Sequence, residues 1–140
     1  VTASPATTIE RAAYIMQIHD ISSLPVVDND ELVGIVTSTD VMGVLLNAIG
    51  MSDESTRLSL FVDDKVGQLA TVSAALSEEQ INIQSFFCYP VHDYKSLIQL
   101  VIRVHNADGA RAVEALEKKG FKVLTQYTKD IRPYLPESVL

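Results

Sequence analysis

One stretch constrains the fold of this chain more than any other: residues 31–40, where an apolar run changes abruptly into a polar turn. The run Glu31–Val36 contains Val and Ile, which favour strands, and hydroxyl and carboxyl side chains follow it directly. Beyond Asp40, apolar residues recur at helical spacing, at Val41, Val44, Leu45 and Ala48. We therefore expect a strand, a short turn and a helix over about residues 40–49, with Gly50 as the cap at its end.

The polar turn can serve either a ligand or the helix itself. A helix start offers unpaired backbone N–H groups and a partial positive charge, which suit a phosphate or another polar ligand head. The hydroxyls of Thr37 and Thr39 can donate hydrogen bonds there, and the Asp40 carboxylate can accept from a pair of ribose hydroxyls. In the alternative interpretation, which spacing alone favours, Thr39 or Asp40 simply caps the helix.

The residues before this stretch predict the rest of a small mixed unit. The lead-in to Pro5 should be extended, because proline disfavours a helical conformation in the residue before it. Thr7 and Glu10 match a capping box, and apolar residues at helical spacing then predict a helix that ends near His19. A run at residues 24–28 should pair with the run at residues 31–36. The expected order is strand–helix–strand–strand–helix.

The same residues resemble a known family. The run Leu24-Pro25-Val26-Val27-Asp28, followed by Gly34-x-x-Thr37-x-x-Asp40, is similar to the second half of a CBS repeat, over residues 1 to about 50. In that family the second motif marks the binding of an adenosyl ligand, so the resemblance implies that Thr37 and Asp40 are the main contacts. The full set of candidate residues is Thr2, Ala3, Ser22, Ser23, Leu24, Pro25, Thr37, Thr39 and Asp40.

The charge of residues 1–50 favours some adenosyl ligands over others. Arg11 is the single basic residue there, against six acidic ones. Hydroxyls and helix-start amides can hold one phosphate, but they poorly offset the repulsion that a triphosphate meets in an acidic module. We expect AMP, adenosine or S-adenosylmethionine as a regulatory ligand rather than ATP, unless magnesium or a basic group from a partner repeat intervenes.

The pattern changes after the polar segment Met51–Thr56. Apolar alternation and sequence context predict strands near residues 57–62, 81–91, 98–104 and 121–127. Helical spacing predicts helices near residues 69–80 and after Asp108, which should cap the second helix before Gly120 ends it. The order β-α-β-β-α-β is the ferredoxin-like unit, which places the chain in the α+β class. The tail, Lys129–Leu140, suits a loose extension or an arm that lies on a partner.

A second resemblance covers about residues 57–127. Asp64-x-x-Gly67-x-Leu69, followed by Ile81-Asn82-Ile83, is similar to an ACT domain, a module that commonly binds amino acids. One departure is that Val66 stands where the family often has proline. The alternative is a plain turn between strand and helix. The candidate residues that the resemblance implies are Asp63, Asp64, Gly67, Gln68, Leu69 and Asn82, and a pairing seam could include Phe86, Phe87 and Tyr89.

Together the two segments resemble the acetoin-utilisation AcuB-type proteins, which usually carry two CBS repeats before the ACT domain. The expected organisation is a CBS repeat at 1–50, a linker at 51–56, an ACT domain at 57–127 and a tail at 128–140. The resemblance implies a regulatory protein without enzymatic activity or a required cofactor, which binds a small-molecule effector and works as a homodimer. The alternative is a ligand-free dimerisation or assembly module of a larger regulatory complex.

Composition excludes several other classes of function. A net charge of −7 disfavours binding to nucleic acid or to an anionic membrane surface, and no apolar run approaches the length of a membrane span. The single cysteine, Cys88, permits no internal disulfide, which favours a cytoplasmic setting. The three histidines are scattered without ligand spacing, and no nucleophile, base and orienting group occur in a catalytic pattern.

Overall fold

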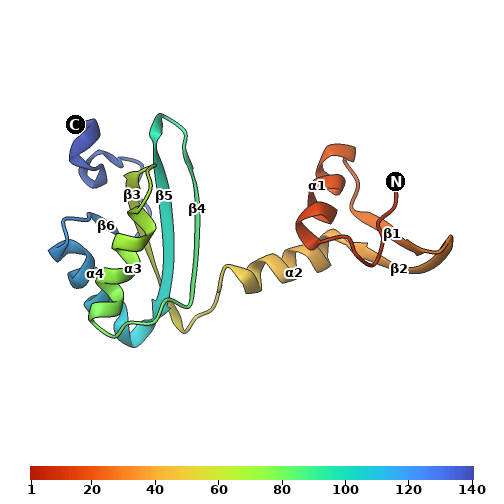
Figure 1. Ribbon diagram of the computed structural model, residues 1–140, viewed down its shortest axis with the longest axis horizontal. Helices are drawn as coiled ribbons and strands as arrows, with labels where there is room; N and C mark the ends of the chain where they lie inside the picture. Colours follow the sequence, from red (N-terminus) through yellow and green to blue (C-terminus); the bar gives the residue numbers. More distant parts are fainter. The chain divides into compact units, whose positions relative to one another are not determined.

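The computed structural model describes all residues, 1–140, which form two compact units, Val1–Ala48 and Ile49–Leu140. The first unit contains α1 (Ile9–His19), β1 (Ser23–Asp28), β2 (Glu31–Thr37) and α2 (Ser38–Ala48) (Figure 1). Strands β1 and β2 form an antiparallel hairpin. Its turn residues, Asn29 and Asp30, both have positive φ angles, of 48° and 64°, as a tight hairpin turn of matching twist requires.

The lead-in adds an extended segment to this hairpin. Ala3 pairs with Val26 in a parallel bridge. The Ala3 N–H donates to the Pro25 carbonyl at 2.9 Å, and the Val27 N–H donates to the Ala3 carbonyl at 2.9 Å. The order strand–helix–strand–strand–helix is thus present, around a small core of Ala3, Ala12, Met16, Leu24 and Val41.

Three local expectations for this unit are wrong. Helix α1 is capped by Thr8, whose hydroxyl accepts from the Arg11 N–H at 3.3 Å, whereas the Thr7 hydroxyl accepts from Ser4 in the preceding turn. Helix α2 begins at Ser38, two residues earlier than expected. Of the apolar face predicted on α2, the structure buries only Val41, because α1 and the hairpin pack against the start of this helix alone; Val44, Leu45 and Ala48 are exposed.

The second unit contains four antiparallel strands, ordered β4-β5-β3-β6, and two helices. Its elements are β3 (Ser55–Asp63), α3 (Gln68–Glu78), β4 (Ser85–Val91), β5 (Tyr94–His105), η1 (Asn106–Asp108), α4 (Gly109–Lys118) and β6 (Val123–Leu124). This is the ferredoxin-like order, so the α+β fold class is confirmed. The helices pack on one face of the sheet (Figure 1), through a core that includes Leu58, Leu60, Val72, Leu76, Ile102 and Leu116.

The opposite face of this sheet is partly covered by the end of the chain. Two short 3₁₀ helices, η2 (Arg132–Tyr134) and η3 (Glu137–Val139), follow β6. Between them Leu135 is only 1% exposed, and it belongs to a second core with Phe61, Val91, Leu97 and Leu124. The expectation of a loose tail is therefore wrong, because the apolar residues on this face of the sheet bind it.

Several predicted boundaries in this unit also differ. Strand β4 begins at Ser85 rather than near residue 81, and β6 has only two residues. Asp108 does not cap α4 through its side chain, because its carboxylate binds Arg111 at 2.8 Å instead. On the same helix Glu114 and Lys118, four residues apart, form an ion pair at 3.3 Å.

Candidate functional site

The start of α2 carries a reciprocal set of hydrogen bonds between Thr37 and Asp40. The Thr37 N–H and the Thr37 hydroxyl both donate to Asp40 Oδ2, each at 2.8 Å. In return the Asp40 N–H donates to Thr37 Oγ1 at 3.2 Å. This is the geometry of a capping box, with Thr37 at the cap and Asp40 three residues later. The pair therefore fixes the orientation of the Asp40 carboxylate and leaves its Oδ1 atom without a partner in the chain.

These bonds lower the pKa of Asp40. The larger cause is the Thr37 backbone N–H, and the second is the Thr37 hydroxyl, since both stabilise the charged form. A depressed pKa in the folded state means that the carboxylate stabilises the fold at pH values above its ordinary 3.8, and that this contribution is lost as the pH falls through the folded value.

We predict that nuclear magnetic resonance titration of the Asp40 carboxyl carbon gives a midpoint below 3.8. Thr37→Val, which removes one of the two donors, should raise this midpoint part of the way back. Thr39→Val is the matched control, because Thr39 makes no bond to Asp40, and it should leave the midpoint unchanged. A wild-type midpoint at or above 3.8 would contradict the observed geometry.

The fold brings the three candidate segments of this unit together. Thr37 stands opposite Ser23 in the hairpin, and the Ser38 N–H donates to the Ser22 carbonyl at 2.8 Å. The segment of Thr2 and Ala3 lies against β1 through the bonds of Ala3 described above. Thr2, Ser22, Pro25, Thr39 and Asp40 are exposed.

Two candidates can contribute only their backbone. Leu24 is fully buried in the core of the unit, and Ala3 is 8% exposed. Their side chains hold the hairpin, the lead-in and α1 together, so they position the exposed candidates around them.

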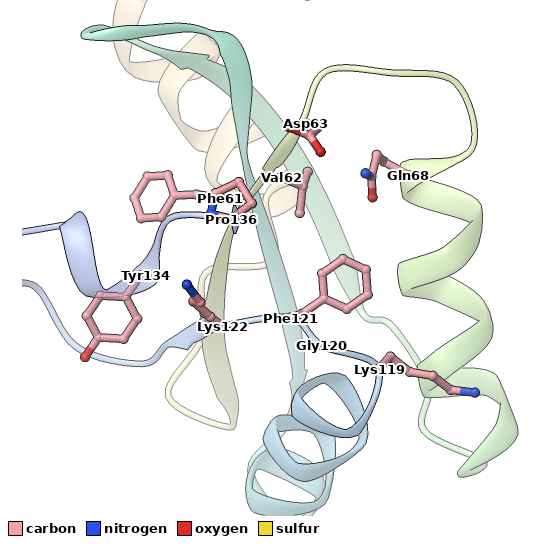
Figure 2. Close-up of a pocket in the computed structure, with 10 residues that line it drawn as sticks. All are labelled: Phe61, Val62, Asp63, Gln68, Lys119, Gly120, Phe121, Lys122, Tyr134 and Pro136. Atoms are coloured by element: carbon pink, nitrogen blue, oxygen red, sulfur yellow. The ribbon is translucent and has the colours of Figure 1, made fainter. Parts of the chain in front are cut away.

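The candidate residues of the second unit are divided between different places. Asp63 and Gln68 line a pocket of about 110 Å³ between the end of β3, the start of α3 and the end of the chain (Figure 2). Asn82 lines a separate shallow depression beside α3. Asp64, Gly67 and Leu69 line neither. The remaining walls of the first pocket are Phe61, Val62, Lys119, Gly120, Phe121, Lys122, Tyr134 and Pro136.

The charged groups of this pocket already have partners, and most of them come from the C-terminal segment. The Ser138 hydroxyl donates to Asp63 Oδ1 at 2.5 Å. Lys122 Nζ donates to the Leu135 carbonyl at 2.6 Å and lies 3.4 Å from a Glu137 carboxylate oxygen. A carboxylate and an ammonium group thus face a small pocket, each held by residues 135–138.

Sequence reasoning missed Lys122 and Tyr134 as residues of this pocket. Lys122 follows Gly120, which ends α4 with a φ of 89°, and it directly precedes β6, which pairs with β3. The only signal for Tyr134 was an aromatic residue in a tail otherwise expected to be loose. Neither residue belongs to a motif of the resemblance.

The structure contains no group of three or more His, Cys, Asp or Glu residues arranged to hold a metal ion. Cys88 lies exposed on β4. No helix has the length and apolar character to cross a bilayer.

Comparison with protein families agrees with both halves of this description. Residues 1–47 match the family model of the CBS domain, and residues 56–121 match that of the ACT domain. The chain carries a CBS domain followed by an ACT domain. CBS and ACT domains are regulatory modules, and the chain is built as a ligand-sensing unit of this kind.

Three similar proteins each match less than half of this chain. Over 45 residues, 31% of this chain, the CBS domain is 49% identical to inosine-5′-monophosphate dehydrogenase from Methanocaldococcus jannaschii, of which the match covers 9%. The regulatory subunit of aspartate kinase from Thermus flavus is 29% identical, with a TM-score of 0.45, over 47% of this chain and 44% of that one. The Thermus thermophilus subunit is 25% identical, with a TM-score of 0.44, over 49% and 44%. The chain thus spans less than half of each of these proteins.

Proposed function

We propose that this chain is a regulatory sensor without enzymatic activity, and that its CBS domain binds an adenosyl ligand at the start of α2. The observation that carries the proposal is the Asp40 carboxylate. Thr37 holds one of its oxygens, and the other, Oδ1, makes no bond within the chain. A fixed acceptor with a lowered pKa remains ionised at neutral pH and suits a ribose hydroxyl. The exposed Thr39 hydroxyl and the helix-start amides lie beside it for a phosphate.

The choice among adenosyl ligands rests on charge. Asp20, Asp28, Asp30 and Glu31 add to Glu10 and Asp40 in residues 1–50, and Arg11 is the single cation. AMP, adenosine and S-adenosylmethionine should therefore raise the unfolding temperature of the protein more than ATP without magnesium does. A thermal-shift screen of these four compounds tests the proposal, and a stabilisation by none of them would refute it.

The ACT domain is proposed to bind a small amino acid in the pocket of Asp63 and Gln68. Its support is complementarity, because Asp63 suits the ligand's ammonium group and Lys122 suits its carboxylate. Residues 135–138 now bind both groups, so a ligand has to share or displace them. The same screen with the twenty amino acids tests this site independently. A link to acetoin utilisation is proposed from the AcuB-type resemblance alone.

The apolar surface of the CBS domain supports association of two copies. On β2, Leu32 is 72% and Ile35 is 63% exposed, and Met42, Val44, Leu45 and Leu46 are exposed along α2. Large exposed apolar surface marks an interaction site in a soluble protein, and two-fold pairing is the commonest closed solution. The same surface would also suit a ligand-free assembly module. If no compound in the screen stabilises the protein, that alternative is favoured.

We predict that light scattering gives a mass near twice the 15.3 kDa of one chain. Ile35→Glu and Leu45→Glu should each shift the protein toward the monomer, because a buried, unpaired carboxylate strongly disfavours the interface. Val66→Glu is the control, since Val66 is a fully exposed apolar residue of the other unit. A monomeric wild type, or monomers from the control alone, would contradict a dimer built on this surface.

A further inference from the structure

The face of the ACT sheet that the helices leave free carries a second concave surface. Alternate residues of β3 point to opposite faces, so Arg57, Ser59 and Phe61 lie on the free face while Leu58 and Leu60 lie under the helices. Gln99 of β5 and Tyr89 of β4 stand in register with Phe61 and share its face. Arg57, Phe61, Tyr89 and Gln99 form one side of a groove.

The other side of the groove comes from the chain that follows β6. Residues 124–128 and Ile131 line it, and the groove has a volume of about 470 Å³. All of this segment lies beyond residues 56–121, which match the ACT family, so this side of the groove comes from outside the matched region. It shares only Phe61 with the pocket of Asp63.

The charge of the groove is unusual for this protein. Arg57 is the only charged residue among the ten that line it, in a chain of net charge −7. Arg57 also stands directly opposite Arg103 of β5, an arrangement of like charges that destabilises a sheet.

Neither arginine is compensated by a carboxylate. Arg103 donates to the Ser55 hydroxyl and to the Met51 sulfur, and no Asp or Glu lies within 4.0 Å of the charged nitrogens of either residue. Six of the nine other basic residues do form ion pairs. Arg57 and Arg103 therefore repel each other without a carboxylate nearby, and a bound anion would reduce that repulsion.

We propose that this groove binds a small organic anion with an apolar body, either a carboxylate or a phosphate monoester. The planar Arg57 guanidinium can pair with either headgroup through two hydrogen bonds. The buried side chains of Phe61 and Leu124 form an apolar floor, and Tyr89, whose ring stacks on Phe87, is 40% exposed at the wall of the groove. Gln99, whose Nε2 donates to Ser59 at 2.6 Å, keeps its amide oxygen for a hydroxyl or amine of the ligand.

The test uses the full chain and four probes that share one ring: benzoate, phenyl phosphate, benzyl alcohol and benzylamine. Their binding is followed by amide chemical shifts up to about 10 mM, which detects dissociation constants in the millimolar range. We expect at least one of the two anions to shift the amides of Arg57, Gln99 and Gln126, and the neutral and cationic probes to do so at least about tenfold more weakly. Which anion binds more tightly distinguishes a carboxylate site from a phosphate site.

Arg57→Gln, which keeps a polar side chain of similar length, should weaken the binding of that anion about tenfold or more. Lys95→Gln is the matched control, since it removes one unpaired cation of the same domain outside the groove, and it should leave the affinity unchanged. Equal affinities in the two variants would overturn the proposal. So would equal binding of benzyl alcohol, shifts confined to other parts of the chain, or no shift with either anion.

Discussion

Asp40→Ala should weaken the binding of AMP, adenosine or S-adenosylmethionine, whichever binds the wild type, by roughly ten- to a hundredfold. The substitution removes the free Oδ1 acceptor and also the Oδ2 atom that receives two bonds from Thr37. The ligand then loses a charged hydrogen-bonding partner, and the first turn of α2 loses the residue that fixes its backbone. Calorimetric titration of both proteins measures the difference.

Two further variants separate the loss of a ligand contact from the loss of a cap. Asp40→Asn keeps an oxygen that can accept from the Thr37 N–H but has no charge, so it should retain most of the thermal stability while losing much of the affinity. Asp28→Ala removes the same charge at the far end of β1 and should alter neither. Equal affinities for wild type and Asp40→Ala would remove Asp40 from the site.

The elements around the Asp40 carboxylate were predictable from the sequence, but the double role of this residue was not. Spacing identified the strand, the turn and the helix, and it offered a cap and a ligand contact as competing interpretations of one residue. In the structure Asp40 accepts from Thr37 with one oxygen and leaves the other free, so the two roles do not exclude each other. The helix begins at Ser38 because Thr37, and not Thr39, has the hydroxyl that reaches the N–H three residues later.

The order of strands and helices in the ACT domain followed from the sequence because its central strands, β3 and β5, carry apolar residues at every second position. Such a pattern says which residues face the helices, as Leu58 and Leu60 do. It does not say what covers the other face. There Phe61 and Leu97 are apolar too, and their cover comes from a segment with two prolines and short 3₁₀ turns, which has no periodicity to detect.

The proposed amino-acid site also depends on contacts that local sequence patterns do not predict. The motif residues Asp64 and Gly67 shape the turn before α3, with Gly67 at a φ of 90°, and the pocket itself takes Lys122 and Tyr134 from later in the chain. Contacts between residues so far apart in sequence depend on how the tail packs, and local spacing carries no information about that.

The packing of the C-terminal segment on the sheet should contribute strongly to the stability of the ACT domain. Leu135→Ala should lower the free energy of unfolding of the ACT domain by about 2–5 kcal/mol, the range found when a fully buried leucine is truncated. The Leu135 side chain is 1% exposed and lies among Phe61, Val91, Leu97 and Leu124, so its loss leaves a cavity. Urea unfolding followed by tyrosine fluorescence reports on this domain, since it contains four of the five tyrosines, at 89, 94, 127 and 134.

Leu140→Ala is the matched control for this effect. It makes the same substitution five residues later, at a side chain that is 70% exposed, and it should change the stability little. Because the Leu135 carbonyl and Ser138 bind Lys122 and Asp63, Leu135→Ala should also free these two groups and make the ACT domain more responsive to amino acids. If both leucine variants unfold at the wild-type urea concentration, the end of the chain is the loose extension that its sequence suggests, and the pocket of Asp63 loses one of its walls.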